Sequence, residues 1–297
     1  MPRLTLILPY YNEADYLGLT LASLKAQEVR DFRLVLVDNA STDGSEAIAR
    51  AAMADATGID VAYLREPRPG KLHALMTGAA AVDSEFIATL DADTIYPPQY
   101  VALCLSLFDA NPRASCVMAA DLYDPPESKA GLAQRRKVAL AASLFPAQCH
   151  TGAFGQAFRT SAYRAAGGYD IARWPFVLED HELPARVMRF GPAVYDQQHY
   201  CFPSDRRVDR GNVNWTLFEQ IVYFLTPARK LDWFLPRSSP TACAVAASKT
   251  STCANATGTD RRFSPLSGRQ GGASEREKSA EHRFCCGLAI WSWGKVN

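Results

Sequence analysis

The chain has 297 residues, of which 48% are hydrophobic and 21% charged, the composition of a globular protein with a substantial core. Its net charge of +1 is spread unevenly: residues 1–235 carry 23 basic and 27 acidic side chains, and residues 236–297 carry 9 and 4. The main body lacks the basic clusters of a nucleic-acid-binding protein, so we expect no nucleic acid partner. No uncharged apolar run reaches the roughly 18 residues that span a bilayer, and the start is too short for a signal peptide. We therefore expect a cytoplasmic protein.

The eight cysteines show neither C-x-x-C pairing nor the spacing of a metal site. Four of them belong to the main body and lie in mostly apolar surroundings: Cys104, Cys116, Cys149 and Cys201. This context predicts buried thiols that pack as small apolar side chains.

Strand and helix patterns alternate through the first ninety residues. Apolar runs predict strands over residues 4–8, 33–37, 61–65 and 86–90, and helical spacing predicts helices over 15–27, 45–54 and 71–81. Strands that alternate with helices imply right-handed crossovers and a mostly parallel sheet. The predicted class is α/β, with a Rossmann-like sheet that has helices on both faces.

The second half of the chain is less regular. Its patterns predict helices over residues 131–144 and 179–190, a short strand over 157–159 and an amphipathic segment over 215–225. Residues 236–280 are rich in Ser, Thr, Arg, Gly and Ala without a sustained period, so residues 236–297 are predicted to form an irregular, disordered tail.

Polar side chains follow three of the predicted parallel strands. They are Asn12, Asp38 and Asp91. Ligands of open α/β sheets bind beyond the carboxyl ends of the strands, where such side chains converge. The sequence therefore predicts one crevice at this edge of the sheet.

Two carboxylates one residue apart, Asp91 and Asp93, follow the strand over residues 86–90. If strand geometry continues past that point, both side chains share a face. Paired carboxylate oxygens suit Mg²⁺ or Mn²⁺, and such an ion bridges the phosphates of a nucleotide. We expect a divalent metal here.

Three segments near this edge each have a functional and a structural interpretation. The turn that ends with Asn12 and Glu13 could cradle a nucleobase, or Asn12 could cap a helix. Asp38 suits hydrogen bonds to a base or ribose, while Asp43 suits the turn that follows. Lys71 could contact phosphate at a helix N-terminus, or it could simply be solvated.

Another pair of carboxylates, Glu179 and Asp180, opens a predicted helix. One of these carboxylates could face a cleft and accept a proton from an attacking hydroxyl. Alternatively, the pair only provides the negative charge that is favourable at a helix N-terminus. His181 and His199 are candidates for a third metal ligand, or they are ordinary surface or core histidines.

In order and spacing, these segments resemble the family 2 glycosyltransferases of the GT-A fold, over roughly residues 4 to 210. The resemblance rests on Leu8-Pro9-Tyr10-Tyr11-Asn12-Glu13, Val37 to Gly44, Gly70-Lys71, Leu90-Asp91-Ala92-Asp93, Gly152-Ala153-Phe154, Phe158-Arg159, Gly167 to Asp170 and Glu179-Asp180. It implies a hexosyltransferase-like enzyme that takes a sugar from a nucleotide-diphosphate sugar donor with inversion. It also implies a domain over residues 1–235, with a nucleotide-binding half (about 1–95) and an acceptor half (about 96–235).

The resemblance also implies a role for each candidate residue. The base and ribose would be held by Pro9, Tyr10, Glu13 and Asp38, with Lys71 near the ribose or diphosphate. Asp91 would face the ribose and the metal, Mg²⁺ or Mn²⁺, and Asp93 would bind the metal. Asp180 would be the general base with Glu179 as its supporting neighbour, and Gly152, Ala153 and Phe154 would line the acceptor side.

A Q-x-x-R-W motif typical of processive synthases is missing, and Pro203-Ser204-Asp205-Arg206-Arg207 resembles the Ser-x-Arg-Arg run of non-processive members. Single addition is therefore expected. Arg206 or Arg207 would neutralise the diphosphate, or the two form a surface basic pair. The acceptor would be a saccharide or a lipid-linked molecule, and in the second case the protein would contact the inner face of the cell membrane.

Two other functions fit the same layout. A sugar-phosphate nucleotidyltransferase would need a Gly-rich basic loop after the first strand, and Leu8 to Glu13 has neither Gly nor Lys. A catalytically silent sugar-nucleotide-binding module would keep Asp38 and Asp91 but could dispense with the base; the presence of both Asp93 and Asp180 favours an active enzyme. A dinucleotide dehydrogenase is excluded, since no G-x-G-x-x-G follows a strand.

Overall fold

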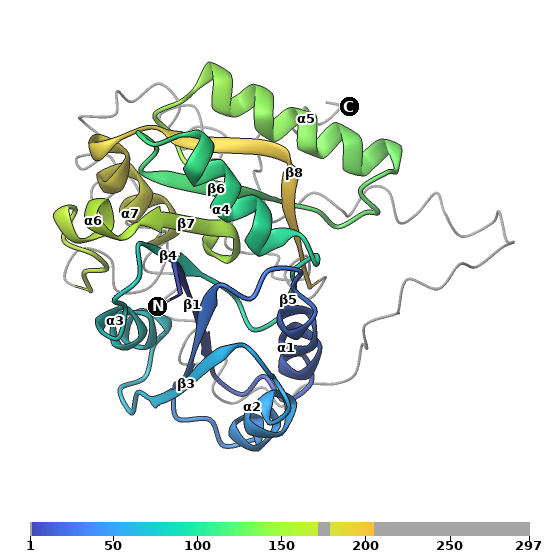
Figure 1. Cartoon of the computed structure of the whole chain (residues 1–297), viewed down its shortest axis with the longest axis vertical. Coiled ribbons are helices and arrows are strands. Elements are labelled where there is room, and N and C mark those ends of the chain that lie inside the picture. Colours follow the sequence, from blue (N-terminus) through green and yellow to red (C-terminus); the bar gives the residue numbers. More distant parts are fainter. Residues whose placement is uncertain (1, 172–178, 205–297) are drawn as a thin grey trace, which may run out of the picture.

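The computed structural model of the chain describes residues 2–171 and 179–204. The strands of this part form one sheet in the order β3-β2-β1-β4-β7-β6-β8-β5 (Figure 1). Their bounds are β1 Leu4–Tyr10, β2 Phe32–Asp38, β3 Asp60–Arg65, β4 Phe86–Thr89, β5 Thr94–Ile95, β6 Cys116–Asp121, β7 Gln156–Arg159 and β8 Ala193–Pro203. The α-helices are α1 Leu17–Lys25, α2 Ser45–Met53, α3 Lys71–Ala80, α4 Tyr100–Ala110, α5 Lys129–Leu144, α6 Thr160–Ala165 and α7 Glu179–Val187.

The first half of the sheet is parallel, as the sequence predicts. β1 lies between β2 and β4, and Leu4 is paired with Phe32 on one side and with Phe86 on the other. β3 extends the parallel sheet beyond β2. Because these strands start in register, their carboxyl ends meet along one edge, and the expected α/β class is confirmed.

The second half departs from simple alternation. β7 is antiparallel to both of its neighbours, β4 and β6, while β8 runs parallel to β6 and antiparallel to β5. Sequence patterns did not predict α4, β6 or β8. The segment that forms α4, YVALCLSLFDA, is apolar nearly all round, so it carries no clear period to separate helix from strand.

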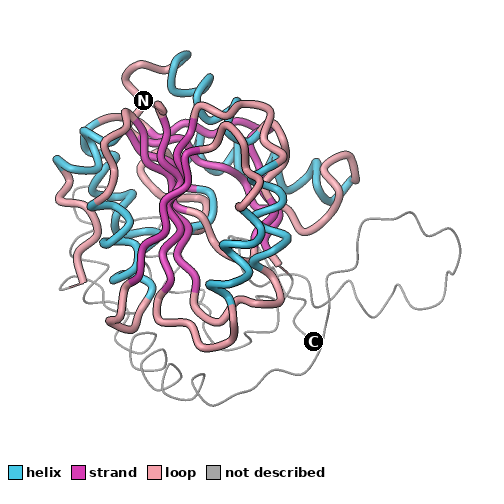
Figure 2. The backbone as a smooth tube through the Cα atoms, turned by 60° about the horizontal axis from the view of Figure 1, so that its bottom comes forward, coloured by secondary structure: helices cyan, strands magenta, loops and turns pink. Residues whose placement is uncertain are grey.

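The sheet has two covered faces, and Figure 2 shows its strands in the middle with helices on either side. Successive residues of β1 and β2 belong to opposite cores: Leu6 and Leu34 pack in one cluster, and Ile7 and Val35 in the other. A strand buried on both faces has no polar side, which is why these segments appear as continuous apolar runs.

Several other sequence predictions have a clear outcome. The four cysteines at 104, 116, 149 and 201 are buried free thiols, as expected. Among the described residues, no helix is both long enough and apolar enough to cross a membrane. The amphipathic segment 215–225, the tail 236–297 and the domain boundary at 235 lie outside the described residues.

Helix α3 approaches β1 closely at Gly78. A Cβ added there would lie 2.4 Å from Cγ2 of Ile7, which is too close for a real contact. A Cβ added at Gly18 in α1 would lie 3.8 Å from its nearest neighbour, Cγ2 of Ile48, which is an ordinary contact distance. Only a glycine therefore allows α3 to pack at its present distance from the sheet.

We predict that Gly78→Ala lowers the free energy of unfolding by about 1–3 kcal/mol, because the added methyl overpacks the core. Gly18→Ala is the matched control, and we expect it to be neutral or to stabilise by up to about 1 kcal/mol through helix propensity. Urea unfolding measures both variants. Equal stabilities would contradict the close packing at Gly78.

Candidate active site

The loops that follow β1 and β2 are held together by side chains. The amide of Asn12 donates to Oγ of Ser41 at 3.1 Å, and the amide of Thr42 donates to Oδ1 of Asn12 at 2.8 Å. Asn12 does not cap α1, which begins at Leu17 after Tyr16. Its side chain therefore joins the two loops at the edge where the carboxyl ends of the strands converge.

Glu13 and Asp43 extend the same connection. The amide of Glu13 donates to Oγ of Ser45 at 2.8 Å, and the amide of Ala14 donates to Oδ2 of Asp43 at 3.0 Å. Burial alone would raise the pKa of Asp43, but hydrogen bonds from Ser45 and Ala14 outweigh it and lower that pKa. Asp43 thus serves the turn, as expected from the sequence.

Asp38 is buried at the end of β2. Its Oδ1 accepts a hydrogen bond from the amide of Ser41 at 3.0 Å, and its Oδ2 lies 4.0 Å from Nε of Arg65. Pro9 and Tyr10 form the end of β1 and are buried as well, and burial together with the charge of Asp38 raises the pKa of Tyr10. The aromatic side chain that is open to solvent on this turn is Tyr11, which is 51% exposed.

Lys71 reaches the site because Asn39 fixes the loop before it. The side-chain amide of Asn39 donates to the carbonyls of Glu66 and Arg68, and its Oδ1 accepts from the amide of Gly70. Gly70 has φ +121°, a conformation that favours glycine. From the start of α3, Nζ of Lys71 lies 2.8 Å from Oδ1 of Asp91. The structure thus pairs two candidate site residues that were identified separately from the sequence.

Asp91 and Asp93 have different partners. Strand β4 ends at Thr89 and a turn follows, so the expected strand alternation does not extend to these two carboxylates. Their exposed fractions are 5% and 1%. Asp91 is paired with Lys71, whereas Oδ2 of Asp93 accepts from Oγ of Ser204 at 2.8 Å. The strand argument for a shared face is therefore wrong, although both side chains do lie beside the end of β4.

The metal prediction has limited support from the protein atoms. Within residues 2–171 and 179–204, no group of three or more His, Cys, Asp or Glu side chains could hold a metal ion. His199 is buried and stacks on the ring of Tyr100 with the centroids 4.7 Å apart, and burial lowers its pKa to about 4. Burial, and to a smaller extent the charge of His181, lowers the pKa of His150 to about 4.

Tyr96 connects the end of β4 to the loop that starts β7. Its buried hydroxyl accepts a hydrogen bond from the amide of Asp91 at 3.0 Å and donates to the carbonyl of Phe154 at 3.1 Å. Oγ1 of Thr89 donates to the carbonyl of Ala153 at 2.8 Å. The Gly152–Phe154 loop, predicted for the acceptor side, is thereby fixed beside Asp91.

Gln156 fixes the backbone at Asp180 in a similar way. Its buried Nε2 donates to the carbonyl of Asp180 at 2.6 Å and to that of Thr151 at 3.2 Å. Further along α7, the buried Arg186 pairs with Glu182 and donates to the carbonyl of Gly168. The first turn of α7 is therefore held close to the same loop.

Sequence reasoning missed Asn39, Tyr96 and Gln156. The predicted residues Glu179, Arg206 and Arg207 have no described side chains. A polar residue directly after β2 was a usable signal for Asn39. For Tyr96 there was none, since a buried aromatic residue looks like any other core residue in the sequence.

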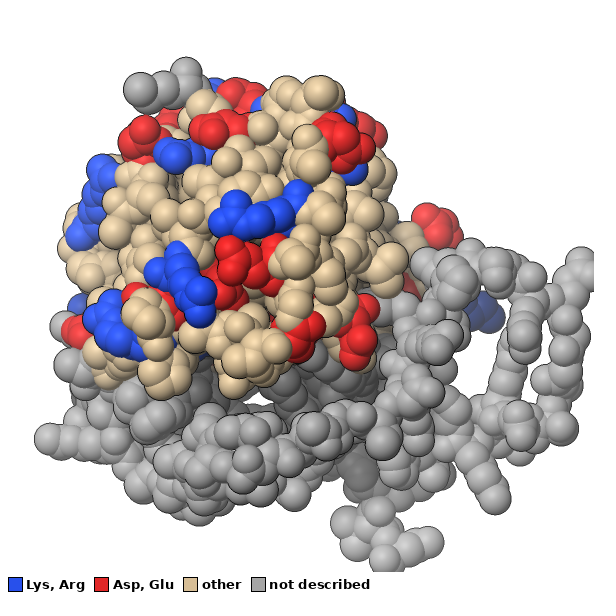
Figure 3. All heavy atoms as spheres, turned by 90° about the horizontal axis from the view of Figure 1, so that it is seen from below, with Lys and Arg blue, Asp and Glu red and all other residues tan. Residues whose placement is uncertain are grey.

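Charges of both signs gather on the face that holds the lower end of the molecule. Figure 3 shows acidic side chains near the centre of this face, with Lys and Arg side chains beside them. The described part of this face therefore carries both signs of charge.

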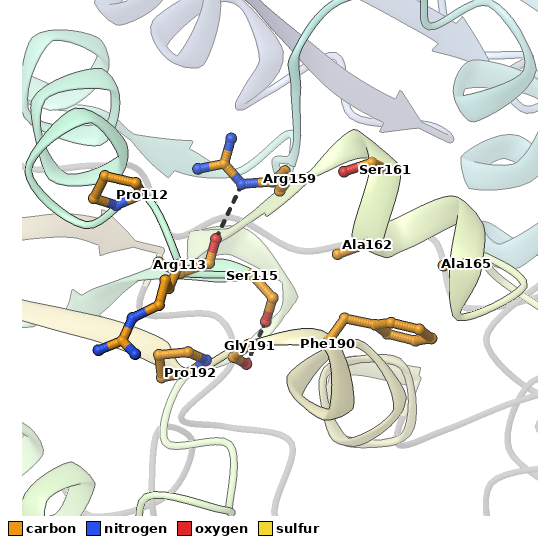
Figure 4. A pocket seen from close by; sticks show the side chains of 11 residues that line it. Pro112, Arg113, Ser115, Arg159, Ser161, Ala162, Ala165, Phe190, Gly191 and Pro192 are labelled. Atoms are coloured by element: carbon orange, nitrogen blue, oxygen red, sulfur yellow. Dashed lines mark hydrogen bonds between the residues drawn. The ribbon is translucent and has the colours of Figure 1, made fainter.

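An open hollow lies elsewhere on the described part of the chain. It has a volume of about 740 Å³ and is lined by residues such as Arg113, Arg159 and Phe190 (Figure 4). Arg159 pairs with Phe86 at the start of β4, whereas Gln156 pairs with Thr89 at its end. The hollow is thus at the opposite end of β7 from the candidate site.

The fold and the site can now be set beside known proteins. A model of glycosyl transferase family 2 matches residues 5–166, which is more than half of the chain. The chain belongs to this family. The resemblance expected from the sequence is confirmed.

Two curated relatives illustrate the family. An undecaprenyl-phosphate 4-deoxy-4-formamido-L-arabinose transferase from Photorhabdus laumondii is 34% identical over 103 residues, 33% of this chain and 31% of that protein. The succinoglycan biosynthesis protein ExoW from Rhizobium meliloti is 31% identical over 130 residues, 41% of this chain and 40% of that one. The chain thus matches less than half of the length of either relative.

Two solved structures share the fold. The mannosyltransferase PcManGT from Pyrobaculum calidifontis, in complex with GDP-Man and Mn²⁺, has a TM-score of 0.60 at 23% identity, over 87% of this chain and 76% of that one. S. aureus TarS 1-349 in complex with UDP-GlcNAc has a TM-score of 0.52 at 16% identity, over 75% and 64%. The likeness shows that the fold is GT-A.

We predict that Tyr96→Phe lowers the free energy of unfolding by about 1–3 kcal/mol, because the Asp91 amide and the Phe154 carbonyl lose a buried partner. Tyr100→Phe is the matched control. The Tyr100 hydroxyl is buried and has no hydrogen-bond partner among the described residues, so its removal is expected to be neutral or stabilising. Thermal unfolding measures both, and equal losses would contradict the role assigned to Tyr96.

Proposed function

We propose that the chain is an inverting glycosyltransferase that moves one sugar at a time from a nucleoside-diphosphate sugar to an acceptor hydroxyl. The observation that carries this proposal is the cluster at the end of β4, where Lys71 is paired with Asp91 and Asp93 lies two residues on. A cation and two buried carboxylates suit a diphosphate and its metal. Membership of family 2 supports the same chemistry.

The donor would lie across the carboxyl ends of β1, β2 and β4. Asp38 would accept hydrogen bonds from the base or ribose, supported by Pro9, Tyr10 and Glu13. Lys71 would contact the ribose or the diphosphate, with Arg206 or Arg207 offsetting further negative charge. In support, Asp38 and Asp91 are already oriented by Ser41 and Lys71.

A divalent metal fits the donor set of this site. Asp93 places carboxylate oxygens beside the end of β4, where its Oδ2 accepts a hydrogen bond from Oγ of Ser204. Mg²⁺ and Mn²⁺ take carboxylate oxygens and complete their coordination with water and substrate phosphates, so a third protein ligand is not required. When bound, the ion would stabilise negative charge on the departing diphosphate.

Asp180 is the proposed general base, with Glu179 beside it. Its carboxylate would take the proton of the acceptor hydroxyl as that oxygen attacks the anomeric carbon. The bond to the diphosphate breaks on the opposite face of the sugar, and this geometry inverts the configuration. The hydrogen bond from Gln156 to the Asp180 carbonyl supports the proposal, because it fixes the helix start that carries the base.

The acceptor would be a saccharide or a lipid-linked molecule of cell envelope polysaccharide synthesis. The names of the relatives support this class, since one is an undecaprenyl-phosphate transferase and another a succinoglycan biosynthesis protein. The Gly152–Phe154 loop, which lies beside Asp91 through Tyr96, would face the acceptor.

Titration of UDP, GDP and dTDP into the protein, with and without Mn²⁺, tests the donor site. We expect one nucleotide to bind in a metal-dependent way, and Asp93→Ala to weaken that binding by at least roughly tenfold, because a charged ligand to the metal is lost. The matched control is Asp55→Ala, which removes an exposed carboxylate paired with Lys25. Metal-independent binding, or equal affinity in both variants, would contradict the role of Asp93.

Asp180→Asn separates chemistry from binding. We expect kcat to fall by roughly 10²–10⁴-fold while nucleotide affinity is unchanged, because an amide cannot accept the proton. Hydrolysis or transfer from the donor that the titration identifies provides the assay. Asp109→Asn, at an exposed carboxylate bonded to Arg3, is the control and should retain full turnover. Normal kcat in Asp180→Asn would exclude it as the base.

A further inference from the structure

The outer face of α5 is a feature that the proposed catalytic site does not use. Residues Lys129–Leu144 contain four basic side chains and no acidic one, in a main body with more acidic than basic residues. The helix lies along the outside of the molecule (Figure 1). Its charge therefore contrasts with the part of the chain to which it is attached.

One side of α5 is anchored to the sheet. The buried Arg135 donates to the carbonyls of Pro126 and Gln197 and lies over the ring of Tyr200. Val138 is buried on the same side. Lys137 is half-buried, and burial lowers its pKa. These contacts fix which side of the helix is turned away from the protein.

The opposite side forms a stripe, which we call the α5 outer face. It consists of residues three or four positions apart that are all exposed: Lys129, Ala133, Arg136, Leu140 and Leu144. Leu140 is 61% exposed and Leu144 is 63% exposed. They are the two most exposed of the five exposed large hydrophobic side chains in the described part of the chain, and they lie one helical turn apart.

This combination of side chains favours one kind of occupant. Basic residues attract anionic lipid headgroups, and leucines next to them can enter the boundary between headgroups and acyl chains. A carboxylate on the stripe would oppose both contacts, and α5 has none. The charge and the apolar pair thus match a negatively charged bilayer.

The position of the α5 outer face also fits contact with a bilayer. Leu144 precedes Phe145, whose carbonyl lies 2.8 Å from Nε2 of His150, two residues before Gly152. The next residue, Thr151, and Asp180 at the start of α7 both accept hydrogen bonds, through their carbonyls, from Nε2 of Gln156. The apolar end of the α5 outer face is therefore adjacent to the loop and the helix start that carry the proposed acceptor side.

We propose that the α5 outer face docks on an anionic lipid bilayer and so places the acceptor side of the site at the membrane surface. The docking itself rests on α5 alone. Its purpose, delivery of a lipid-linked acceptor, rests on the proposed function.

Co-sedimentation of the full chain with vesicles tests the docking. We expect binding to phosphatidylcholine vesicles that contain phosphatidylglycerol and much weaker binding to phosphatidylcholine alone. Leu140→Gln combined with Leu144→Gln should lower the partition coefficient by roughly tenfold or more, because two apolar side chains no longer enter the bilayer. Lys129→Gln combined with Arg136→Gln should weaken binding most at low salt.

Two matched variants keep this test specific. Leu19→Gln changes an exposed leucine on α1, and Arg113→Gln changes an exposed arginine away from α5. Both should bind vesicles as the unmodified chain does. The proposal is overturned if the unmodified chain does not bind, if the α5 variants bind normally, or if Leu19→Gln loses as much binding. It is also overturned if the leucine pair holds two copies together, which sedimentation of the protein alone detects.

The same samples separate this proposal from the proposed function. Nucleotide titration of the α5 variants should give unchanged affinity, because none of the substituted residues lies at the end of β4. Vesicle binding without nucleotide binding would refute the glycosyltransferase site and leave the docking surface intact. Nucleotide binding without vesicle binding would refute the docking surface and leave the proposed glycosyltransferase site intact.

Discussion

The buried hydroxyl of Tyr96 is the contact on which the arrangement of the site depends most. It takes a hydrogen bond from the Asp91 amide and gives one to the Phe154 carbonyl, so a single side chain joins the end of β4 to the start of β7. Both contacts are buried, where hydrogen bonds are strong and an unpaired group is costly. The proposed donor and acceptor sides therefore have a fixed relation before any ligand arrives.

The proposed nucleotide side is also organised by hydrogen bonds from buried or partly buried polar side chains. Short polar side chains bond to backbone groups of neighbouring loops: Asn12 to the loop after β2, and Asn39 to the loop before α3. Loops held in this way do not need to be ordered when a ligand binds, which reduces the entropic cost of binding. The placement of Lys71 beside Asp91 is thus a consequence of Asn39 and Gly70 as much as of its own sequence position.

Sequence patterns located the parallel half of the sheet and most of the charged residues of the candidate site. Continuous apolar runs reveal strands buried on both faces, and polar residues after such strands, such as Asp38 and Asp91, indicate the proposed ligand edge. The remaining features depend on contacts distant in sequence. Nothing local distinguishes Tyr96 from a core tyrosine such as Tyr100, and the alternation argument for Asp91 and Asp93 was wrong because β4 ends at Thr89.

The two carboxylates after β4 are held from different parts of the chain. Asp91 is paired with the ammonium of Lys71, at the start of α3, with Nζ and Oδ1 2.8 Å apart, whereas Oδ2 of Asp93 accepts a hydrogen bond from Ser204, just after β8. Charges attract more strongly in a buried site than in water, so the pair of Lys71 and Asp91 fixes the start of α3 relative to the end of β4. The contact with Ser204 joins the end of β8 to the same turn. The parallel half of the sheet and its irregular half therefore meet at the two proposed ligands of the ribose and the metal.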